Sequence, residues 1–267
     1  MARKKAKSTP GPYILRVQLL RERVTTPDRY PFNLPAVRNL DTLAFHPKVT
    51  FFVGENGAGK STLLEALAVL YDLNPEGGSR NFHFATRASH SALDGCLRLA
   101  KTFGTPGDSY FLRAESYFNV ATEIERLDRE RDPRVYTPPL IDSYGRQSLH
   151  EQSHGESFFA LFKNRFGGNG LYLMDEPEAA LSPRRQIEFL AVLHDFCKRG
   201  SQFVIATHSP IIMAYPDALL YVFGADGVRA VPYTETEHYR LTRGFLSNPA
   251  QVLSELMADG PAGEGGA

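Results

Sequence analysis

The sequence is poor in three features that mark specialised classes of protein: cysteine, net charge and long apolar runs. Its 267 residues include two cysteines, and its 30 basic residues balance 30 acidic ones. Cys96 and Cys197 are far apart in the chain, so neither a disulfide framework nor a zinc-binding spacing is present, which suits a reducing cytosol. The balanced charge excludes a global field that would attract nucleic acid or membrane, although a local basic patch stays open.

No apolar run approaches the roughly 18 residues of a membrane-spanning helix. The first seven residues are basic, but Ser-Thr-Pro-Gly-Pro follows them instead of an apolar stretch, so they do not form a secretory signal. We expect residues 1–12 to be a disordered basic tail rather than a nucleic-acid arm, and residues 259–267 to be a second disordered tail. Internal repeats and long heptad runs are absent. These absences indicate a cytoplasmic globular protein, and a hydrophobic fraction of 42% is enough for a real core.

One loop carries the strongest functional signal. Residues 54–61 read Gly-Glu-Asn-Gly-Ala-Gly-Lys-Ser, after an apolar run at 49–53 and before leucines at helical spacing in 63–70. Strand, glycine loop and helix in this order are typical of a phosphate-binding loop, because the glycines let several N–H groups converge and the helix dipole adds positive charge. The residues predicted to bind nucleotide here are Gly54, Glu55, Asn56, Gly57, Ala58, Gly59, Lys60, Ser61 and Thr62. Lys60 is expected to reach the β- and γ-phosphates, and the Ser61 hydroxyl to ligate Mg²⁺.

The remaining pattern predicts an α/β fold. In the first half we expect strands near 13–20, 42–45, 95–102 and 109–113, then a helical stretch from residue 116. In the second half we expect helices at 155–166, 183–198 and about 249–257, and strands at 171–174, 202–206, 219–223 and 228–231. The alternation of strands and helices in the second half favours a mainly parallel sheet, and the strand-rich beginning favours an antiparallel flank.

Two further strands are expected to deliver polar groups to the phosphate loop. The strand at 171–174 ends in Asp175 and Glu176, where Asp175 would share Mg²⁺ with Ser61 and Glu176 would act as general base on the attacking water. The strand at 202–206 ends in Thr-His, and His208 would donate a hydrogen bond to the γ-phosphate. Ser153 and Gly155 precede a helix whose first N–H groups suit another phosphate, although helix capping alone also explains them.

Together these residues resemble the ATP-binding-cassette (ABC) type of ATPase. Residues 54–61 look like Walker A, 171–176 like Walker B with its catalytic glutamate, and Ser-His-Gly-Glu at 153–156 is similar to the family signature Ser-Gly-Gly-Gln. Residues 180–183 stand where the D-loop should be, and His208 matches the switch histidine. Within that superfamily the motifs look like the soluble branch of RecF/SMC-like and OLD-like ATPases, and most like its small stand-alone members.

The resemblance implies a P-loop fold of the ABC type spanning residues 13–258, with a helical signature subdomain inserted at about 72–166. It also implies an ATP- and Mg²⁺-dependent ATP hydrolase in which Lys60, Glu176 and His208 are catalytic. Two copies would pair head to tail, with each ATP between Walker A of one chain and Ser153 and Gly155 of the other. DNA or a protein effector is the implied further partner, and a membrane subunit is disfavoured.

The sequence departs from the family pattern at three places. His154 and Glu156 stand where the signature usually has Gly and Gln, and no glutamine follows the strand at 109–113, where Glu115 is the nearest substitute for the Q-loop residue. The aromatic residue that would stack on adenine stays open among Tyr30, Phe32 and Phe45.

Three other functions stay open beside the soluble ATPase with a DNA-maintenance or defence role. A transporter's nucleotide-binding subunit is disfavoured by the altered Q-loop and by the helix after the signature, which lacks the arginine usual in transporters. A GTPase or small-molecule kinase is disfavoured because no Asn/Thr-Lys-x-Asp base-reading motif is present. An attached nuclease is disfavoured because the residues after His208 show no acidic metal cluster.

Overall fold

The computed structural model describes residues 10–79, 91–114, 117–131, 138–144 and 154–258 of the chain. Its centre is a six-stranded sheet with the strand order β5-β6-β7-β3-β8-β9. The first five strands run parallel and β9 runs antiparallel to β8. The strands are β3 (Val49–Gly54), β5 (Asp108–Arg113), β6 (Gly170–Asp175), β7 (Gln202–Ala206), β8 (Ala218–Gly224) and β9 (Gly227–Ala230).

A second, three-stranded antiparallel sheet has the order β2-β1-β4. It consists of β1 (Ile14–Leu19), β2 (Thr42–Ala44) and β4 (Leu97–Lys101). The prediction of a mainly parallel sheet with an antiparallel flank is therefore confirmed.

The helices surround the large sheet, and among the described residues none is long and apolar enough to cross a membrane. The α-helices are α1 (Pro35–Arg38), α2 (Lys60–Leu70), α3 (Tyr117–Arg129), α4 (His154–Ala160), α5 (Pro183–Lys198), α6 (Pro210–Met213), α7 (Glu237–Ser247) and α8 (Pro249–Ala258). The short helical turns are η1 (Arg21–Arg23), η2 (Asp94–Cys96), η3 (Leu140–Tyr144), η4 (Leu161–Arg165), η5 (Pro177–Ala180) and η6 (Tyr233–Glu235).

Alternation along β3 builds a core on each face of the large sheet. Val49, Phe51 and Val53 face the cluster that includes α3, α4, α5 and α6, whereas Phe52 faces the opposite cluster. Successive strand residues point to opposite faces, so an all-apolar strand must be covered on both sides. That covering explains why β3 is buried along its whole length.

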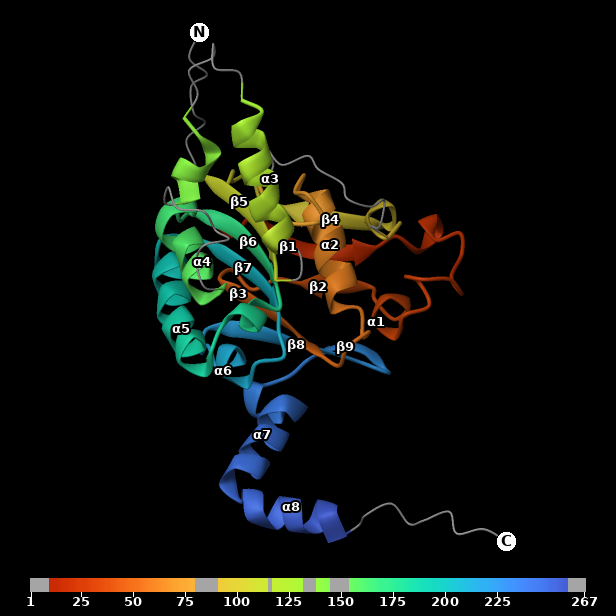
Figure 1. The fold of residues 1–267 in the computed structure, drawn as a ribbon. Coiled ribbons are helices and arrows are strands. Elements are labelled where there is room, and N and C mark those ends of the chain that lie inside the picture. The colour runs from red at the N-terminus through yellow and green to blue at the C-terminus, as the bar shows by residue number, and fades with distance from the viewer. Residues whose placement is uncertain (1–9, 80–90, 115–116, 132–137, 145–153, 259–267) are drawn as a thin grey trace, which may run out of the picture.

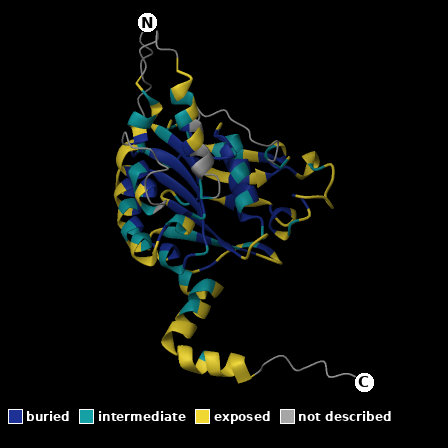
Figure 2. Ribbon diagram, in the orientation of Figure 1, coloured by how far each residue is buried: buried dark blue, intermediate teal, exposed yellow. Residues whose placement is uncertain are grey.

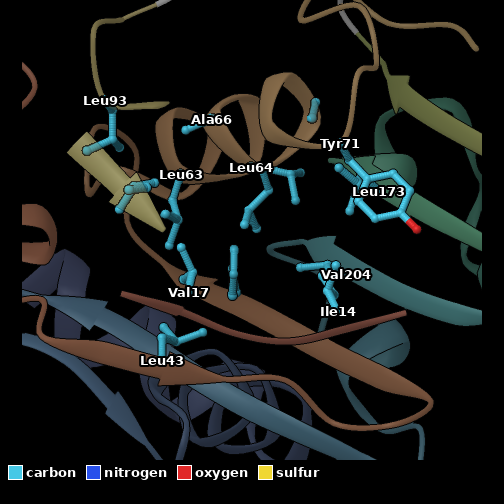
Figure 3. Close-up of a cluster of buried hydrophobic side chains, with 14 of the residues drawn as sticks. Ile14, Val17, Leu43, Leu63, Leu64, Ala66, Tyr71, Leu93, Leu173 and Val204 are labelled. Carbon is cyan, nitrogen blue, oxygen red and sulfur yellow. The ribbon is translucent and has the colours of Figure 1, made fainter. Parts of the chain in front are cut away.

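Helix α2 lies between the two sheets and fills the core on one side. Its Leu63 and Leu64 belong to one buried cluster with Val17 of β1 and Val204 of β7. Figure 3 shows these leucines directed from the helix toward the strands. Because α2 begins at Lys60, this packing also fixes the position of the phosphate loop.

On the other face, α5 and the segment from α4 to η4 pack through aromatic rings. Phe162 makes edge-to-face contacts with Phe166, Phe189 and Phe196 at centroid distances of 4.8, 5.5 and 5.4 Å. Such pairs contribute about 0.5–1.5 kcal/mol each beyond the burial of their area. The helix after the signature is thus held against the sheet by ring packing.

The bounds of α5 agree with the predicted helix at 183–198, and its start has a clear cause. Ser182 caps the helix by accepting from the Arg185 N–H, and Pro183 occupies the first helical position, where a missing N–H costs nothing. The stretch at 72–166, expected as a helical insert, also contributes strands: β4 pairs with β1, and β5 forms an edge of the large sheet. Its helical part runs from α3 to η4 in the described residues.

Helices α7 and α8 form an arm that leaves the body of the molecule beside α6 (Figure 1). Most of its surface is exposed, whereas the strands and α2 are buried (Figure 2). No helix was expected at α7, and α8 agrees with the helix expected near 249–257. The predicted tails at 1–12 and 259–267 lie almost entirely outside the described residues.

Candidate active site

Three parallel strands end at one edge of the large sheet, and a chemically active residue follows each of them. β3 leads into the phosphate loop, β6 ends at Asp175, and β7 leads through Thr207 to His208. Since β7 pairs with both β3 and β6, the three ends are neighbours. Ligands of open α/β sheets bind at this carboxyl edge, so the fold itself brings these residues together.

The phosphate loop adopts backbone conformations that glycine favours. Gly54, Gly57 and Gly59 have φ of 146°, 77° and 98°. A Cβ added at Gly54 would lie 2.3 Å from the Phe223 carbonyl oxygen, so a side chain there would push the loop off β8. A Cβ at Gly57 would meet nothing within 4 Å. The loop therefore combines close packing at its start with an open backbone in its middle, where a phosphate group can approach.

Lys60 is buried at the first turn of α2, and its ammonium group is held by polar neighbours. Nζ donates to the carbonyl oxygens of Gly54 at 2.7 Å and Glu55 at 3.0 Å, and lies 3.0 Å from His208 Nε2. Burial lowers the pKa of Lys60 below its usual value, while the nearby carboxylates, Glu176 first, act in the opposite direction. The side chain is thus fixed across the loop with its charge inside the site.

Ser61 and Asp175 are directly connected. The Ser61 hydroxyl donates to Asp175 Oδ1 at 3.0 Å, and Arg113 Nε lies 3.8 Å from Asp175 Oδ2. A hydroxyl and a carboxylate beside a phosphate loop fit Mg²⁺, which binds to one or two protein oxygens and completes its shell with phosphate oxygens and water. This hydrogen bond holds the two oxygens 3.0 Å apart, where both could bind the same Mg²⁺ ion.

Burial raises the pKa of Asp175 to about 6, and the Arg113 guanidinium and the Ser61 hydrogen bond oppose this rise. In the unfolded chain an aspartate titrates near 3.9. Because the pKa is higher in the folded state, protonation of this carboxyl group favours the fold. That contribution to the free energy of unfolding is complete below about pH 4 and is lost as the pH rises through about 6. Without nucleotide and Mg²⁺, we therefore expect Asp175→Asn to be more stable than the wild type at pH 7.5 by up to about 3 kcal/mol.

This difference should shrink as the pH falls toward 4.5, because the wild-type carboxyl group becomes neutral like the amide. Denaturant unfolding of both proteins between pH 4.5 and 7.5 measures it. A stability difference that does not change with pH would show that Asp175 is ionised in the fold over this whole range.

Glu176 follows Asp175 in a left-handed backbone conformation, with φ 51° and ψ 52°. Its N–H donates to the Ala206 carbonyl at 2.9 Å, and its Oε1 lies 3.5 Å from His208 Nε2. Non-glycine residues adopt positive φ uncommonly, and such positions cluster at active sites. Here the turn directs the carboxylate toward His208, and the side chain is 38% exposed and so open to water.

The loop that carries His208 is held by Glu178. Glu178 accepts from the His208 N–H at 2.5 Å through Oε1 and from the Thr207 hydroxyl at 2.8 Å through Oε2. Burial raises the pKa of Glu178, and burial and the neighbouring Lys60 lower the pKa of His208. The imidazole is therefore neutral at pH 7. Its Nδ1 lies 3.2 Å from Nε2 of His238, on α7.

The structure separates the three aromatic candidates for stacking on adenine. Phe32 and Phe45 are 6% and 7% exposed and belong to the core, so they have no free ring face for a base. Tyr30 is 61% exposed, and its hydroxyl lies 3.0 Å from Thr62 Oγ1, beside the phosphate loop. Of the three, Tyr30 therefore has a ring exposed enough to stack on adenine.

A cavity of about 560 Å³ opens beside the loop. It is lined by residues 54–58 of the phosphate loop, the turn between β8 and β9, and Glu237 and His238 at the start of α7. Its size suits a small-molecule ligand.

The signature region is only partly described. Ser153 and the Q-loop substitute Glu115 lie outside the described residues. Gly155 lies in the first turn of α4 beside η5, where an added Cβ would be 3.6 Å from the Ala180 carbonyl oxygen. The start of the signature helix therefore contacts the segment expected to be the D-loop.

Sequence reasoning assigned no role to Glu178, Arg113 or His238. Glu178 belongs to the quoted Asp-Glu-Pro-Glu motif, and its position two residues after Glu176 was the available signal. Arg113 ends β5 and pairs with Glu65 at 2.6 Å as well as approaching Asp175. His238 stands in a polar stretch with no local signal, 30 residues after the histidine that it contacts.

The chain is similar in sequence to known ATP-binding proteins. Two family profiles match the chain: "AAA domain" over residues 32–131, and "AAA domain, putative AbiEii toxin, Type IV TA system" over residues 142–214. The xylose import ATP-binding protein XylG of Thermoanaerobacter pseudethanolicus is 28% identical over 196 residues, which cover 65% of this chain and 37% of that protein. The energy-coupling factor transporter ATP-binding protein EcfA1 of Methanospirillum hungatei is 24% identical over 252 residues, covering 87% of this chain and 88% of that protein.

The chain spans little more than a third of the length of the first curated relatives that it matches. Among solved structures it is similar to the SMC head domain from Thermotoga maritima, with 17% identity, a TM-score of 0.42, and coverage of 82% of this chain and 98% of that one. The two AAA-domain profiles and the ATP-binding relatives together support a place for this chain in the ABC-type ATPase superfamily.

Proposed function

We propose that the protein binds Mg²⁺-ATP at the phosphate loop and hydrolyses it in a head-to-tail dimer that nucleotide holds together. The observation that carries the proposal is the convergence of Lys60, Ser61, Asp175, Glu176 and His208 at one edge of one sheet. These groups come from three separate parts of the chain, and capping or core packing alone does not explain why they meet.

In this proposal the loop backbone and Lys60 hold the β- and γ-phosphates. Ser61 and Asp175 would hold Mg²⁺, which when bound neutralises charge on the phosphate oxygens. Gly54 and Glu55 already accept from Lys60 Nζ, so the ammonium group is positioned before nucleotide arrives. Less side-chain freedom is then lost on binding.

Glu176 would accept the proton of the attacking water, and His208 would hydrogen-bond the γ-phosphate. The carboxylate is partly exposed and close to His208, so a water molecule can reach it from the open side of the site. His208 reaches this position because Glu178 holds its backbone and Thr207. Hydrolysis requires no covalent enzyme intermediate in this arrangement, and positioning supplies the catalysis.

A second copy would close the open side. One chain alone leaves the γ-phosphate exposed to bulk water, and the start of α4, with Gly155 and Ser153, would cover it from the partner. Loss of phosphate after hydrolysis would remove charge that both halves bind and would release them.

Tyr30 would stack on the adenine ring. Stacking of a base on an aromatic side chain contributes about 1–3 kcal/mol, so Tyr30→Ala should weaken ATP binding about tenfold or more. Tyr30→Phe keeps the ring and loses only the hydroxyl contact with Thr62, and it should bind ATP nearly as the wild type does. Calorimetric titration of both variants with ATP checks this, and equal affinity of Tyr30→Ala and wild type would place the base elsewhere.

The biological role depends on the molecule on which the proposed dimer acts. We propose a cytoplasmic ATPase that serves DNA maintenance or defence, or drives a partner protein, since the soluble-branch motifs and the toxin-system profile over residues 142–214 support it. The second candidate is the nucleotide-binding subunit of a transporter, favoured by the names of relatives such as the xylose importer's ATP-binding protein. ATPase stimulation by DNA that weakens with salt would support the first, and co-purification with a membrane subunit the second.

Measurements of the ATP hydrolysis rate and of the molecular mass in solution together test the central proposal. ATP hydrolysis should require Mg²⁺ and should be inhibited by excess ADP more than by GDP. Light scattering should find a dimer with a slowly hydrolysed ATP analogue and a monomer with ADP. Absence of turnover in the purified chain at saturating Mg²⁺-ATP would overturn the proposal, and turnover without dimer formation would overturn its shared site.

A further inference from the structure

We propose that His238, on the exposed arm, is a positioning residue that holds the switch imidazole of His208 in the orientation that γ-phosphate recognition requires. This inference rests on the proposed function, because it concerns the same site. The centroids of the two rings are 5.4 Å apart at an interplanar angle of 50°, and His208 Nδ1 lies 3.2 Å from His238 Nε2.

The proton positions follow from the neighbours of His208. The Lys60 ammonium can only donate, so His208 Nε2, at 3.0 Å from it, must accept. In a neutral imidazole one nitrogen accepts and the other donates, so Nδ1 carries the proton and donates it to His238 Nε2. The pair is therefore a directed hydrogen bond from the switch residue to the arm.

Contact with a phosphate requires the His208 proton to be on the other ring nitrogen. A phosphate oxygen only accepts, so a neutral His208 that contacts it must carry its proton on Nε2 and must accept at Nδ1. His238 Nε2 accepts in one of its tautomers and donates in the other, and it can thus partner His208 in both arrangements. An aliphatic side chain could do neither.

The root of the arm is fixed where this contact needs it. The Tyr233 hydroxyl donates to the Pro210 carbonyl at 2.9 Å, two residues after His208. Thr236, 1% exposed, caps α7 by accepting from the Tyr239 N–H. His238 comes two residues later and also lines the cavity beside the phosphate loop. The first turn of α7 is therefore anchored to the switch loop, while the rest of the arm extends into solvent (Figures 1 and 2).

The test is a set of steady-state measurements on His238→Ala and His238→Gln. Loss of the outer-shell partner of a metal-bound histidine costs roughly 10- to 100-fold. We expect a loss of similar size here, so kcat of His238→Ala should fall at least about tenfold while KM for ATP changes less than about twofold. Glutamine offers both a donor and an acceptor, and it should restore kcat to within about threefold of the wild type. Arg240→Ala, on the exposed side of the same turn, is the matched control and should leave both constants unchanged.

A double-mutant cycle separates positioning from a structural effect. In a His208→Ala background, His238→Ala should lower kcat no further, because its effect passes through the missing ring. Additive losses in the double variant, an unaffected His238→Ala, or a glutamine variant as poor as the alanine one would each overturn the proposal.

Nitrogen-15 spectra of the histidine rings provide a readout that does not need turnover. In wild-type protein without nucleotide, His208 should be protonated on Nδ1, because Lys60 donates to Nε2. His238→Ala should keep this tautomer but shift the Nδ1 resonance, because the Nδ1 proton loses its acceptor. An unchanged Nδ1 resonance in that variant would overturn the inference even if the protein hydrolyses ATP. Lack of ATP hydrolysis with the expected Nδ1 shift would instead overturn only the proposed function.

Discussion

Glu176→Gln is expected to bind ATP with nearly wild-type affinity and to hydrolyse it at least 100-fold more slowly. An amide of the same shape keeps the contacts of the side chain but cannot accept the proton of the attacking water, and a general base contributes about 10²–10⁴ to the rate. The left-handed turn at Glu176 and the 3.5 Å approach to His208 hold the side chain at the site in either form. The loss should appear in kcat, because the interaction acts in the transition state.

The same variant should accumulate as a dimer with ATP. If γ-phosphate holds the two halves together, a chain that retains its phosphate cannot separate at the normal rate. Light scattering at saturating Mg²⁺-ATP and single-turnover kinetics measure the two effects on one sample. Glu235→Gln removes an exposed carboxylate near the start of α7 and is the matched control, expected to behave as the wild type.

Two results would contradict this prediction in different ways. Turnover within a few-fold of the wild type would mean that another group takes the proton. A monomer at saturating ATP, with turnover lost as expected, would keep the catalytic role of Glu176 and remove the shared site.

The parts of this protein that could be predicted from sequence are those that local chemistry defines. The glycines of the phosphate loop, the apolar strands β3 and β7, and the capped helix α5 each carry their signal within a few residues. The alternation of strands and helices in the second half then implied a parallel sheet, and the sheet carries Lys60, Asp175 and His208 to one edge. Periodicity and turn chemistry are sufficient for such elements.

The features that could not be predicted from the sequence depend on contacts between distant parts of the chain. Tyr30, Phe32 and Phe45 are alike in sequence, and only packing tells that two of them lie in the core and one is exposed beside Thr62. His238 gains its role because Tyr233 and Thr236 anchor α7 to the switch loop. No residue of α7 is buried and its composition is mainly polar, so no core-forming apolar segment marks this helix in the sequence.

Lys60→Ala is expected to lose most of the affinity for ATP. The side chain is the cation that Gly54 and Glu55 carbonyls and His208 hold across the loop, and its removal leaves the β- and γ-phosphates without their closest positive side chain. A hydrogen bond to a charged group is worth about 1.5–3 kcal/mol, so loss of contacts to two phosphates should weaken binding at least 100-fold. ADP keeps the β-phosphate contact and should lose less affinity than ATP.

Calorimetric titration of Lys60→Ala with ATP and ADP measures both losses, and Lys198→Ala, which removes an exposed lysine at the end of α5, is the matched control. Melting temperatures without nucleotide separate lost binding from lost folding. Because burial already lowers the pKa of Lys60, removing this charge relieves a desolvation cost, and the variant should not melt earlier than the wild type. Unchanged ATP affinity in a folded Lys60→Ala variant would refute the phosphate-binding role of the loop, and with it the reason why Asp175, Glu176 and His208 converge there.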